Sequence, residues 1–293
     1  MDSLFWNVRG SNGAMKQLEL SRFIKAHKFS FVSLMETKLD IEGHQVLKRK
    51  LRFHNSSFLS AEGRLCLFWN SALVDVSILE HSPQHIHCSI FCKQTSRIFF
   101  VTSVYASNLY AERLMLWKII TQISTKVNGS PWIVGGDYNE VRYSSEKFGG
   151  RPVHQRRLRK FNSCIEESGL FDLKAYGQTL SWNNRQDSRI MCRLDRVLVN
   201  ASFTNSYPHS LVHYLAPGIS DHSPMQVSYE PAFPTGPKPF KYFEMWETNN
   251  GRASDSRASV ATQRGAKGGI GGETTGIQRG RDGSVDNREF LGE

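Results

Sequence analysis

The sequence contains no apolar run of about 18 residues, the length that a membrane-spanning helix needs, and no apolar signal-peptide segment near its start. Cysteine is also scarce, with five residues among 293 and no Cys-x-x-Cys motif. Secreted domains usually carry cysteines in pairs, whereas this number is odd. We therefore expect an intracellular protein whose cysteines are buried thiols and which has no membrane partner.

Acidic residues are fewer than basic ones, with 27 Asp and Glu against 37 Lys and Arg. The formal net charge is +10 and the pI is near 9.4. This balance favours an anionic partner, with nucleic acid first and a membrane surface or a polyphosphate as alternatives. Hydrophobic residues make up 39% of the chain and aromatic residues 11%, which is enough to fill a substantial core.

Large apolar side chains are nearly absent from residues 251–293, which hold ten of the 23 glycines. Such a segment cannot offset its ordering entropy by burial. We therefore expect a folded domain over residues 1–232, a linker over 233–250 and a disordered Gly/Arg-rich tail over 251–293. The tail has seven basic and six acidic residues, so the positive charge belongs to the folded domain.

Short apolar runs alternate with segments of helical period over the first 230 residues, which is typical of a mixed α/β domain. The expected strands are 4–7, 31–36, 65–69, 74–79, 87–91, 98–105, 132–136, 193–199, 211–215 and 225–229. The expected helices are 16–26, 44–52, 110–127 and 155–167. Because hairpins rather than crossovers join several strands, we predict two packed sheets flanked by helices.

The dipeptide Asp221-His222 brings a carboxylate and an imidazole together just before an apolar, strand-like run. Alone, Ser220-Asp221-His222 more often only caps a turn through hydrogen bonds to the backbone. It is accompanied by polar groups at the ends of other apolar runs, namely Asn7, Glu36, Tyr105, Asp137, Asn139 and Asp195. The combination indicates a site for phosphate-ester hydrolysis.

Asp137 and Asn139 are two residues apart, so in a continuing strand their side chains project to one side. The carboxylate can then orient or deprotonate a water molecule, and the amide can hold the water or a phosphate oxygen. The alternative is a Gly-Gly-Asp turn that caps the strand. Glu36 suits a hard divalent cation such as Mg²⁺, with Asn7 as a neutral ligand or phosphate donor. The alternative for Glu36 is a solvated strand end.

Asp195 lies between apolar residues and is expected to be buried, so it needs a partner. His222 is one candidate, because a carboxylate on one ring nitrogen fixes the tautomer and raises the imidazole pKa. The alternative is a salt bridge from Asp195 to Arg193 or Arg196. The Tyr105 hydroxyl can donate to a phosphoryl oxygen, or Tyr105 is a core aromatic residue.

In this order, the motifs resemble the exonuclease/endonuclease/phosphatase superfamily of metal-dependent phosphodiesterases over about residues 1 to 230. More narrowly, they are similar to the endonuclease domain of a plant-type LINE (non-LTR) retrotransposon. The blocks that carry this resemblance are Trp6-Asn7-Val8-Arg9-Gly10, Glu36-Thr37-Lys38, Gly135-Gly136-Asp137-Tyr138-Asn139-Glu140, Gly149-Gly150, Thr179-Leu180-Ser181-Trp182, Arg193-Leu194-Asp195-Arg196 and Gly218-Ile219-Ser220-Asp221-His222-Ser223. The resemblance implies a four-layer α/β sandwich of two mixed β-sheets, with the site at their shared mouth.

The resemblance also implies a role for each site residue in Mg²⁺-dependent cleavage of DNA, with Mn²⁺ as a substitute. The implied metal ligands are Glu36, Asn7 and Asp221. The implied catalytic residues are Asp137 and Asn139 on the attacking water, His222 oriented by Asp195 on the transition state, and Tyr105 on the scissile phosphate. The implied substrate-binding residues are Asn7, Thr179 and Ser220. The product would be a nick with a free 3′-hydroxyl, made by a monomer in the nucleus.

Two features depart from the family pattern. Repair-type members carry an acidic residue where this chain has Arg9, which favours the retrotransposon branch. The family's Phe-Lys-x-x-x-x-Trp segment is present from Phe240 to Trp246, but unrelated sequence follows Asn250 and no reverse transcriptase domain is expected in this chain. The alternatives are therefore an inactive transposon-derived nucleic-acid-binding relic, or a phosphatase acting on lipid or inositol phosphates.

Overall fold

The structure, a computed structural model, describes residues 1–59, 64–127 and 129–230. The chain divides into two units, Met1–Thr235 and Gly236–Glu293, and the first contains all of the described residues. The expected linker and tail lie outside the described residues, so both remain predictions. Among the described helices, none is long and apolar enough to cross a membrane.

The first sheet has seven strands. In chain order they are β1 (Asp2–Asn7), β2 (Phe31–Met35), β3 (Asn55–Leu59), β4 (Leu65–Trp69), β11 (Ala175–Gly177), β15 (Leu211–Tyr214) and β16 (Met225–Ser228). Their order across the sheet is β11-β15-β16-β1-β2-β4-β3. The central strands β1 and β2 run parallel with Asn7 beside Met35, so both end at the same edge of the sheet.

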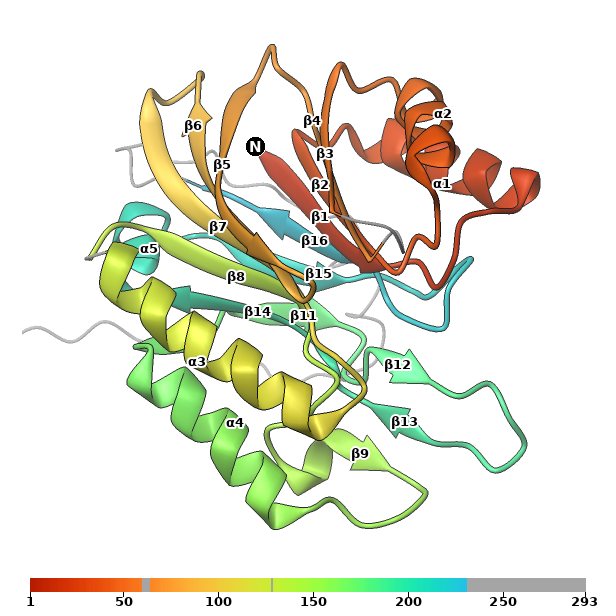
Figure 1. The fold of residues 1–293 in the computed structure, drawn as a ribbon, viewed down its shortest axis with the longest axis vertical. Helices are drawn as coiled ribbons and strands as arrows, with labels where there is room; N and C mark the ends of the chain where they lie inside the picture. Colours follow the sequence, from red (N-terminus) through yellow and green to blue (C-terminus); the bar gives the residue numbers. More distant parts are fainter. Residues whose placement is uncertain (60–63, 128, 231–293) are drawn as a thin grey trace, which may run out of the picture. The chain divides into compact units, whose positions relative to one another are not determined.

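Two helices, α1 (Ala14–His27) and α2 (Ile41–Leu51), cover the outer face of this sheet (Figure 1). Leu20 of α1 and Leu47 of α2 are fully buried in a cluster that also contains Leu4 of β1. The side chain of Asp40 caps α2 by accepting a hydrogen bond from the backbone N–H of Gly43 at 2.7 Å, which explains why the helix begins there. The helices thus pack on the sheet that carries Asn7.

The second sheet has six strands. They are β5 (Val74–Ser82), β6 (His85–Cys92), β7 (Arg97–Tyr105), β8 (Trp132–Asp137), β10 (Leu170–Asp172) and β14 (Asp195–Asn200), arranged as β10-β14-β8-β7-β6-β5. Helices α3 (Tyr110–Val127) and α4 (Gln155–Glu167) cover its outer face (Figure 1). They pack together through Trp117 and Phe161, whose rings stack at 4.6 Å.

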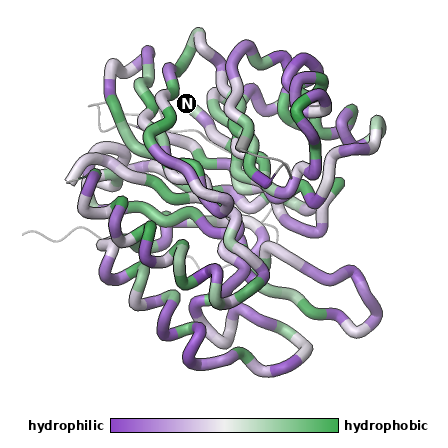
Figure 2. The backbone as a smooth tube through the Cα atoms, in the orientation of Figure 1, coloured by the Kyte–Doolittle hydropathy of each residue, from purple (hydrophilic) through white to green (hydrophobic). Residues whose placement is uncertain are grey.

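The inner faces of the two sheets pack against each other and form the central core. Phe5 and Phe31 from the first sheet and Val101, Ile133 and Val197 from the second are essentially inaccessible to solvent in one cluster. Figure 2 shows hydrophobic segments running along these strands and hydrophilic ones on the exposed turns of the helices. The predicted four-layer α/β sandwich of two mixed β-sheets is therefore confirmed.

Three short strands make a small third sheet in the order β12-β13-β9. They are β9 (Lys147–Phe148), β12 (Trp182–Asn183) and β13 (Met191–Cys192). A 3₁₀ turn, η1 (Ser144–Glu146), precedes β9, and a short helix, α5 (Ala201–Ser206), follows β14. An isolated bridge joins Trp182 to His222, so this small sheet is fastened to the Asp-His motif.

All ten expected strands and all four expected helices occur, with ends that differ by at most a few residues. Sequence analysis missed β3, β9, β10, β11, β12, β13 and α5. Most of these are two or three residues long, and β11 is exposed throughout, so no apolar run identifies them. The five cysteines are free and buried, as expected.

Candidate active site

The site lies where strand ends of both large sheets meet. In the second sheet, parallel pairing places Tyr105, at the end of β7, beside Asp137, at the end of β8. Antiparallel pairing places Asp195, the first residue of β14, opposite the same Asp137. Asn7 ends β1 in the first sheet, and its side-chain amide donates to Asp137 Oδ2 at 2.9 Å. This hydrogen bond joins the two sheets at the bottom of the cleft.

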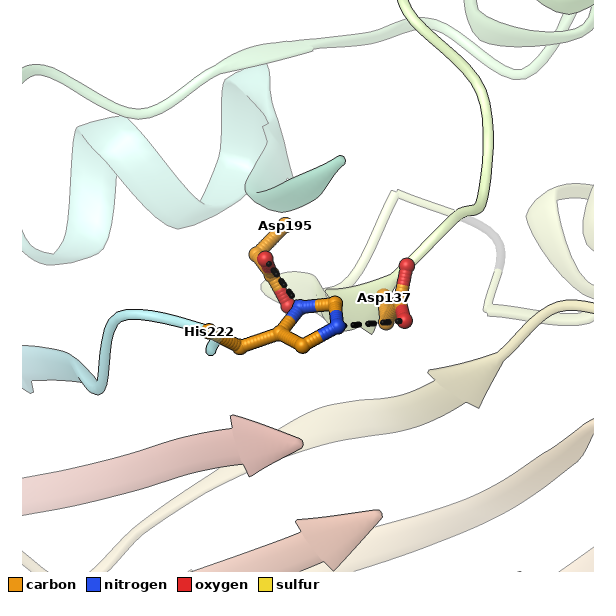
Figure 3. Close-up of side chains that lie close together, drawn as sticks. All are labelled: Asp137, Asp195 and His222. Carbon is orange, nitrogen blue, oxygen red and sulfur yellow. Dashed lines mark hydrogen bonds and ion pairs between the residues drawn. The ribbon is translucent and has the colours of Figure 1, made fainter. Parts of the chain in front are cut away.

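His222 lies between two buried carboxylates (Figure 3). Its Nδ1 is 2.9 Å from Asp195 Oδ2 and its Nε2 is 3.9 Å from Asp137 Oδ2. Asp195 is fully buried and His222 is 4% exposed. The predicted pairing of Asp195 with His222 is therefore present. The alternative is not, because Arg196 pairs with Glu146 and Asp172, and Arg193 pairs with Asp172.

The carboxylates decide the charge of His222. Burial alone would lower the pKa of the imidazole, but Asp195 and Asp137 raise it to about 9. The ring is therefore protonated at neutral pH and donates through both nitrogens. Its Nδ1–H is directed at Asp195, which leaves Nε2–H for the cleft. This arrangement supplies a fixed positive donor in a dry environment, which is the type of group that stabilises developing negative charge.

Asp137 is the opposite case, an acid whose charge is disfavoured. Burial and the neighbouring Asp195 raise the pKa of Asp137 to about 6, against the opposing effects of His222 and of hydrogen bonds. The backbone N–H of Asn139 donates to Oδ1 at 2.9 Å, and Asn7 donates to Oδ2. A carboxylate with a pKa just below neutral is suited to accept a proton from water.

Asn139 does not continue the strand, so the expectation of extended geometry from Asp137 to Asn139 is wrong. β8 ends at Asp137, and Asn139 adopts a left-handed conformation with φ of 47°. The hydrogen bond from the Asn139 backbone N–H to Asp137 stabilises this turn, and Asn is one of the few residues that adopt the left-handed conformation readily. The Asn139 side chain donates to the carbonyl of Ala106 at 2.7 Å, which holds the amide at the cleft.

Gly136 explains the glycine pair before Asp137. Its φ is 147°, and a Cβ at this position would lie 1.9 Å from the carbonyl oxygen of Val104 on the adjacent β7. A side chain there would push β8 away from β7. Glycine therefore allows the close strand approach that sets Asp137 beside Tyr105.

Glu36 and Tyr105 line the same cleft, which has a volume of about 290 Å³ and also includes Asn7, Asp137, Asn139 and His222. Glu36 follows β2 with a φ of 53°, and its Oε1 is 3.1 Å from Lys38 Nζ. Burial and the negative charges of Glu36 and Asp137 raise the pKa of Tyr105, so its hydroxyl remains a donor. Tyr105 is thus both a buried aromatic residue and a cleft residue.

The structure tests whether these residues suit a divalent cation. Asp137, Asp195 and His222 offer ligand atoms within 4.8 Å of one another. However, the protonated ring of His222 cannot act as a metal ligand. Glu36, Asn7 and Asp137 provide oxygens on the cleft, and Asp195 Oδ1 is buried with no hydrogen-bond partner among the described residues. Excess carboxylate oxygen of this kind suits a hard cation such as Mg²⁺.

Asp221 and Ser220 hold the loop before β16. The hydroxyl of Ser220 donates to the carbonyl of Asn7 at 2.7 Å. Asp221 Oδ2 accepts hydrogen bonds from the Arg9 guanidinium and from Trp182 Nε1, the latter at 2.9 Å. Ser220 thus ties the loop to β1, whereas Asp221, which we expected to bind metal, is occupied by protein donors.

Sequence reasoning missed three residues that support the site. The hydroxyl of Ser181 accepts from the backbone N–H of Asp195 at 2.9 Å, and Trp6 Nε1 donates to the carbonyl of His222 at 3.0 Å. Trp182 lines the cleft. Thr179, the residue expected from the same motif, is exposed and is not among the described residues that line the cleft. Ser181 and Trp182, which lie in the same motif as Thr179, were the signal in the sequence that could have identified these residues.

Comparison with known proteins identifies the fold and family. A model described as "Endonuclease/Exonuclease/phosphatase family" matches residues 4–222. No curated protein matches the chain. A 3′-5′ exonuclease (NExo) from Neisseria meningitidis is similar, with 15% identity, a TM-score of 0.62 and coverage of 78% of this chain and 100% of that chain.

Two further similar structures have different described activities, one an endonuclease and the other a phosphatase. The endonuclease domain of TRAS1, a telomere-specific non-LTR retrotransposon, has 16% identity and a TM-score of 0.57, over 78% of this chain and 97% of that chain. A mannosyl-6-phosphatase from Bacteroides thetaiotaomicron has 16% identity and a TM-score of 0.54, over 78% and 98%. At these identities the similarity establishes the fold, whereas the substrate has to be inferred from the residues of the site.

Proposed function

The chain belongs to the endonuclease/exonuclease/phosphatase family, and on that premise we propose that it is a Mg²⁺-dependent phosphodiesterase that nicks DNA. The observation that carries this proposal is the buried Asp195–His222 pair, whose free Nε2 faces Asp137 across a cleft that also contains Glu36. This arrangement combines a charged donor, a proton acceptor and oxygen ligands around one small space.

In the proposed reaction, Asp137 accepts a proton from the attacking water. Its pKa of about 6 leaves it deprotonated at neutral pH but still basic enough for this step. Asn139, whose amide is held at the Ala106 carbonyl, positions the water and a phosphate oxygen. The new bond forms from the water oxygen to phosphorus. The bond to the 3′-oxygen breaks, and that oxygen leaves with a proton from solvent as a 3′-hydroxyl.

His222 stabilises the charge that accumulates on the phosphorus centre. Its protonated Nε2 donates to a non-bridging oxygen, while Asp195 holds the ring through Nδ1. The Tyr105 hydroxyl donates to the same phosphate. Glu36 and Asn7 would hold Mg²⁺, which supplies positive charge to the phosphate when bound. Ser220 supports Asn7 from its backbone side, and Thr179 stays a predicted substrate contact.

Charge supports a polyanionic substrate such as DNA over a membrane lipid. The net charge of +10 favours a polyanion, whereas a lipid phosphatase would benefit from an apolar membrane-binding surface. A retrotransposon-type endonuclease acting as a monomer in the nucleus is the more specific form of the proposal. It is supported by the sequence motifs and by the similarity in fold to the TRAS1 domain. An inactive nucleic-acid-binding relic is the competing hypothesis.

A nicking assay on supercoiled plasmid separates these hypotheses. Wild-type protein should convert plasmid to the open-circular form with Mg²⁺ or Mn²⁺ and should not do so in excess EDTA. Asp137→Asn should abolish nicking, while Asp75→Asn, at an exposed residue of β5, should not. Equal nicking by Asp137→Asn, or nicking in EDTA, would reject the proposed site. DNA binding without nicking by the wild type would favour the relic.

A lipid or inositol phosphatase predicts a different outcome. Such an enzyme would release inorganic phosphate from a soluble inositol phosphate and leave the plasmid intact. Phosphate release can be measured in parallel with nicking on the same protein preparation. Nicking without phosphate release supports the DNA substrate.

A further inference from the structure

Arg9 and Asp221 form an ion pair between segments 212 residues apart in the sequence. Arg9 follows β1 with a φ of 45°, and its backbone N–H donates to Asn7 Oδ1 at 2.9 Å. Its guanidinium binds Asp221 Oδ2 through Nη1. The side chain is nevertheless 53% exposed and lines the catalytic cleft. A guanidinium has five N–H donors, so donors remain for a ligand in the cleft.

Asp221 is 7% exposed and is oriented by two donors on Oδ2. Oδ2 accepts from Arg9 and from Trp182 Nε1, and Oδ1 lies 3.4 Å from the hydroxyl of Ser220. Burial would raise the pKa of Asp221, but His222 and Arg9 lower it below its ordinary value. The carboxylate is thus ionised and held in one orientation by protein donors. A metal ion could bind Oδ2 only by displacing them.

The charges around the cleft show why an arginine is needed there. Two carboxylates, those of Glu36 and Asp137, line the cleft that is proposed to accept a phosphodiester anion, and two more, those of Asp195 and Asp221, are bonded to the lining residues His222 and Arg9. Glu36 has Lys38 as a cationic partner and Asp195 has His222. Arg9 neutralises Asp221 and retains donors for a phosphate. Arginine pairs with carboxylates and phosphates through its planar fork, which lysine lacks.

We infer that Asp221 is a positioning residue for Arg9 rather than a metal ligand, and that Arg9 binds a non-bridging phosphate oxygen of the DNA strand in the cleft. The inference rests on the proposed function, because it assumes that the cleft receives a nucleic-acid phosphate. Asp221 presents the guanidinium to the cleft, and Trp182 keeps Asp221 in place. On this inference, Glu36 and Asn7 would hold the metal without Asp221.

The test compares DNA binding and metal binding in separate experiments. A fluorescent DNA duplex is titrated in EDTA, so that no cleavage occurs, with wild type, Arg9→Ala, Arg9→Lys, Asp221→Asn and the double variant Arg9→Ala/Asp221→Asn. Asp221→Asn keeps an acceptor for Trp182 Nε1 and preserves the side-chain shape. Arg49→Ala is the matched control, because Arg49 is exposed near the end of α2 and is not among the described residues that line the cleft.

We expect Arg9→Ala and Asp221→Asn each to weaken DNA binding about 10-fold. The double variant should bind no more weakly than either single variant. The DNA affinity of Arg9→Lys should lie between those of the wild type and Arg9→Ala. The slope of log affinity against log salt should decrease by about 0.9 in Arg9→Ala, as expected for one lost phosphate contact. Arg49→Ala should match the wild type.

Binding of Mn²⁺ to the protein without DNA, followed by electron paramagnetic resonance, is the second measurement. Asp221→Asn should change the Mn²⁺ dissociation constant less than twofold, whereas Glu36→Ala should raise it at least tenfold. A tenfold loss of Mn²⁺ binding in Asp221→Asn with unchanged DNA affinity would make Asp221 a metal ligand and overturn the inference.

The two proposals fail in different ways. Equal DNA affinity in wild type and Arg9→Ala contradicts the inference alone, because DNA still binds. Absence of any DNA binding by the wild type contradicts the proposed function as well. A circular-dichroism melt of each variant checks folding, and Arg9→Lys, which conserves the ion pair, still reports on the fork geometry if Arg9→Ala does not fold.

Discussion

Replacing His44 with Gln should make the stability of the fold less dependent on pH between 7 and 5. The His44 ring is 2% exposed and packs between Phe58 and Phe68, with centroid distances of 4.8 and 5.0 Å. Its Nε2 is 3.0 Å from the hydroxyl of Ser56, and its Nδ1 is buried with no hydrogen-bond partner among the described residues. Burial, with a smaller effect of Lys48, lowers the pKa of His44 to about 4.

The sign follows from where the proton binds. A histidine in the unfolded chain has a pKa near 6.5. Between that value and about 4, the unfolded state binds a proton that the folded state excludes, so the free energy of unfolding falls as the pH falls. For one such histidine the loss is close to zero at pH 7 and about 2 kcal/mol at pH 5. Domains have total stabilities of about 5–15 kcal/mol, so this loss is measurable.

Urea unfolding of wild type and His44→Gln at pH 7 and pH 5 tests this reasoning. Gln can keep a hydrogen bond to Ser56 but loses the ring contacts, so the variant should be less stable at pH 7. That deficit should shrink by about 2 kcal/mol at pH 5, because only the wild type carries the penalty. His54→Gln, at an exposed position, should follow the wild type. A deficit that is equal at both pH values would refute the assigned protonation of His44.

Three further predictions concern the cleft. His222→Ala and Asp195→Asn should each slow nicking about 10²-fold with little change in DNA affinity. The double variant should be little slower than either single variant, since the pair acts as one unit. If the two rate losses instead multiply, the residues act independently. Glu36→Ala should raise the Mg²⁺ concentration needed for nicking, and an unchanged Mg²⁺ titration would remove Glu36 from the metal site. Gly136→Ala should lower stability by on the order of 3 kcal/mol and stop nicking. Gly13→Ala, with open space at its Cβ, should be near neutral. Equal melting temperatures of Gly136→Ala and the wild type would contradict the close approach of β8 to β7.

The sequence alone determined the secondary structure of the core and the positions of most cleft residues. Helices α3 and α4 coincide with the expected ranges, and each long strand was found within a few residues. This succeeded because buried strands and amphipathic helices need apolar side chains at their own periods, which a sequence displays directly. Polar residues that end such runs meet within one sheet where neighbouring parallel strands end at one edge, as Tyr105 and Asp137 do.

Only the tertiary structure decided which polar groups are partners. Asp195 bonds to His222 rather than to Arg196, a choice that the residue types left open and that only the family resemblance favoured, and Asp221 bonds to Arg9, a pair that the sequence did not indicate. Short strands such as β11 and β12 likewise form only because a longer strand or the Asp-His loop is already in place beside them. Local periodicity specifies burial, whereas the pairing of distant residues depends on sheet register and on the packing of one sheet against another. For that reason the cleft residues could be named from the sequence, but the roles of Arg9, Ser181 and Asp221 could not.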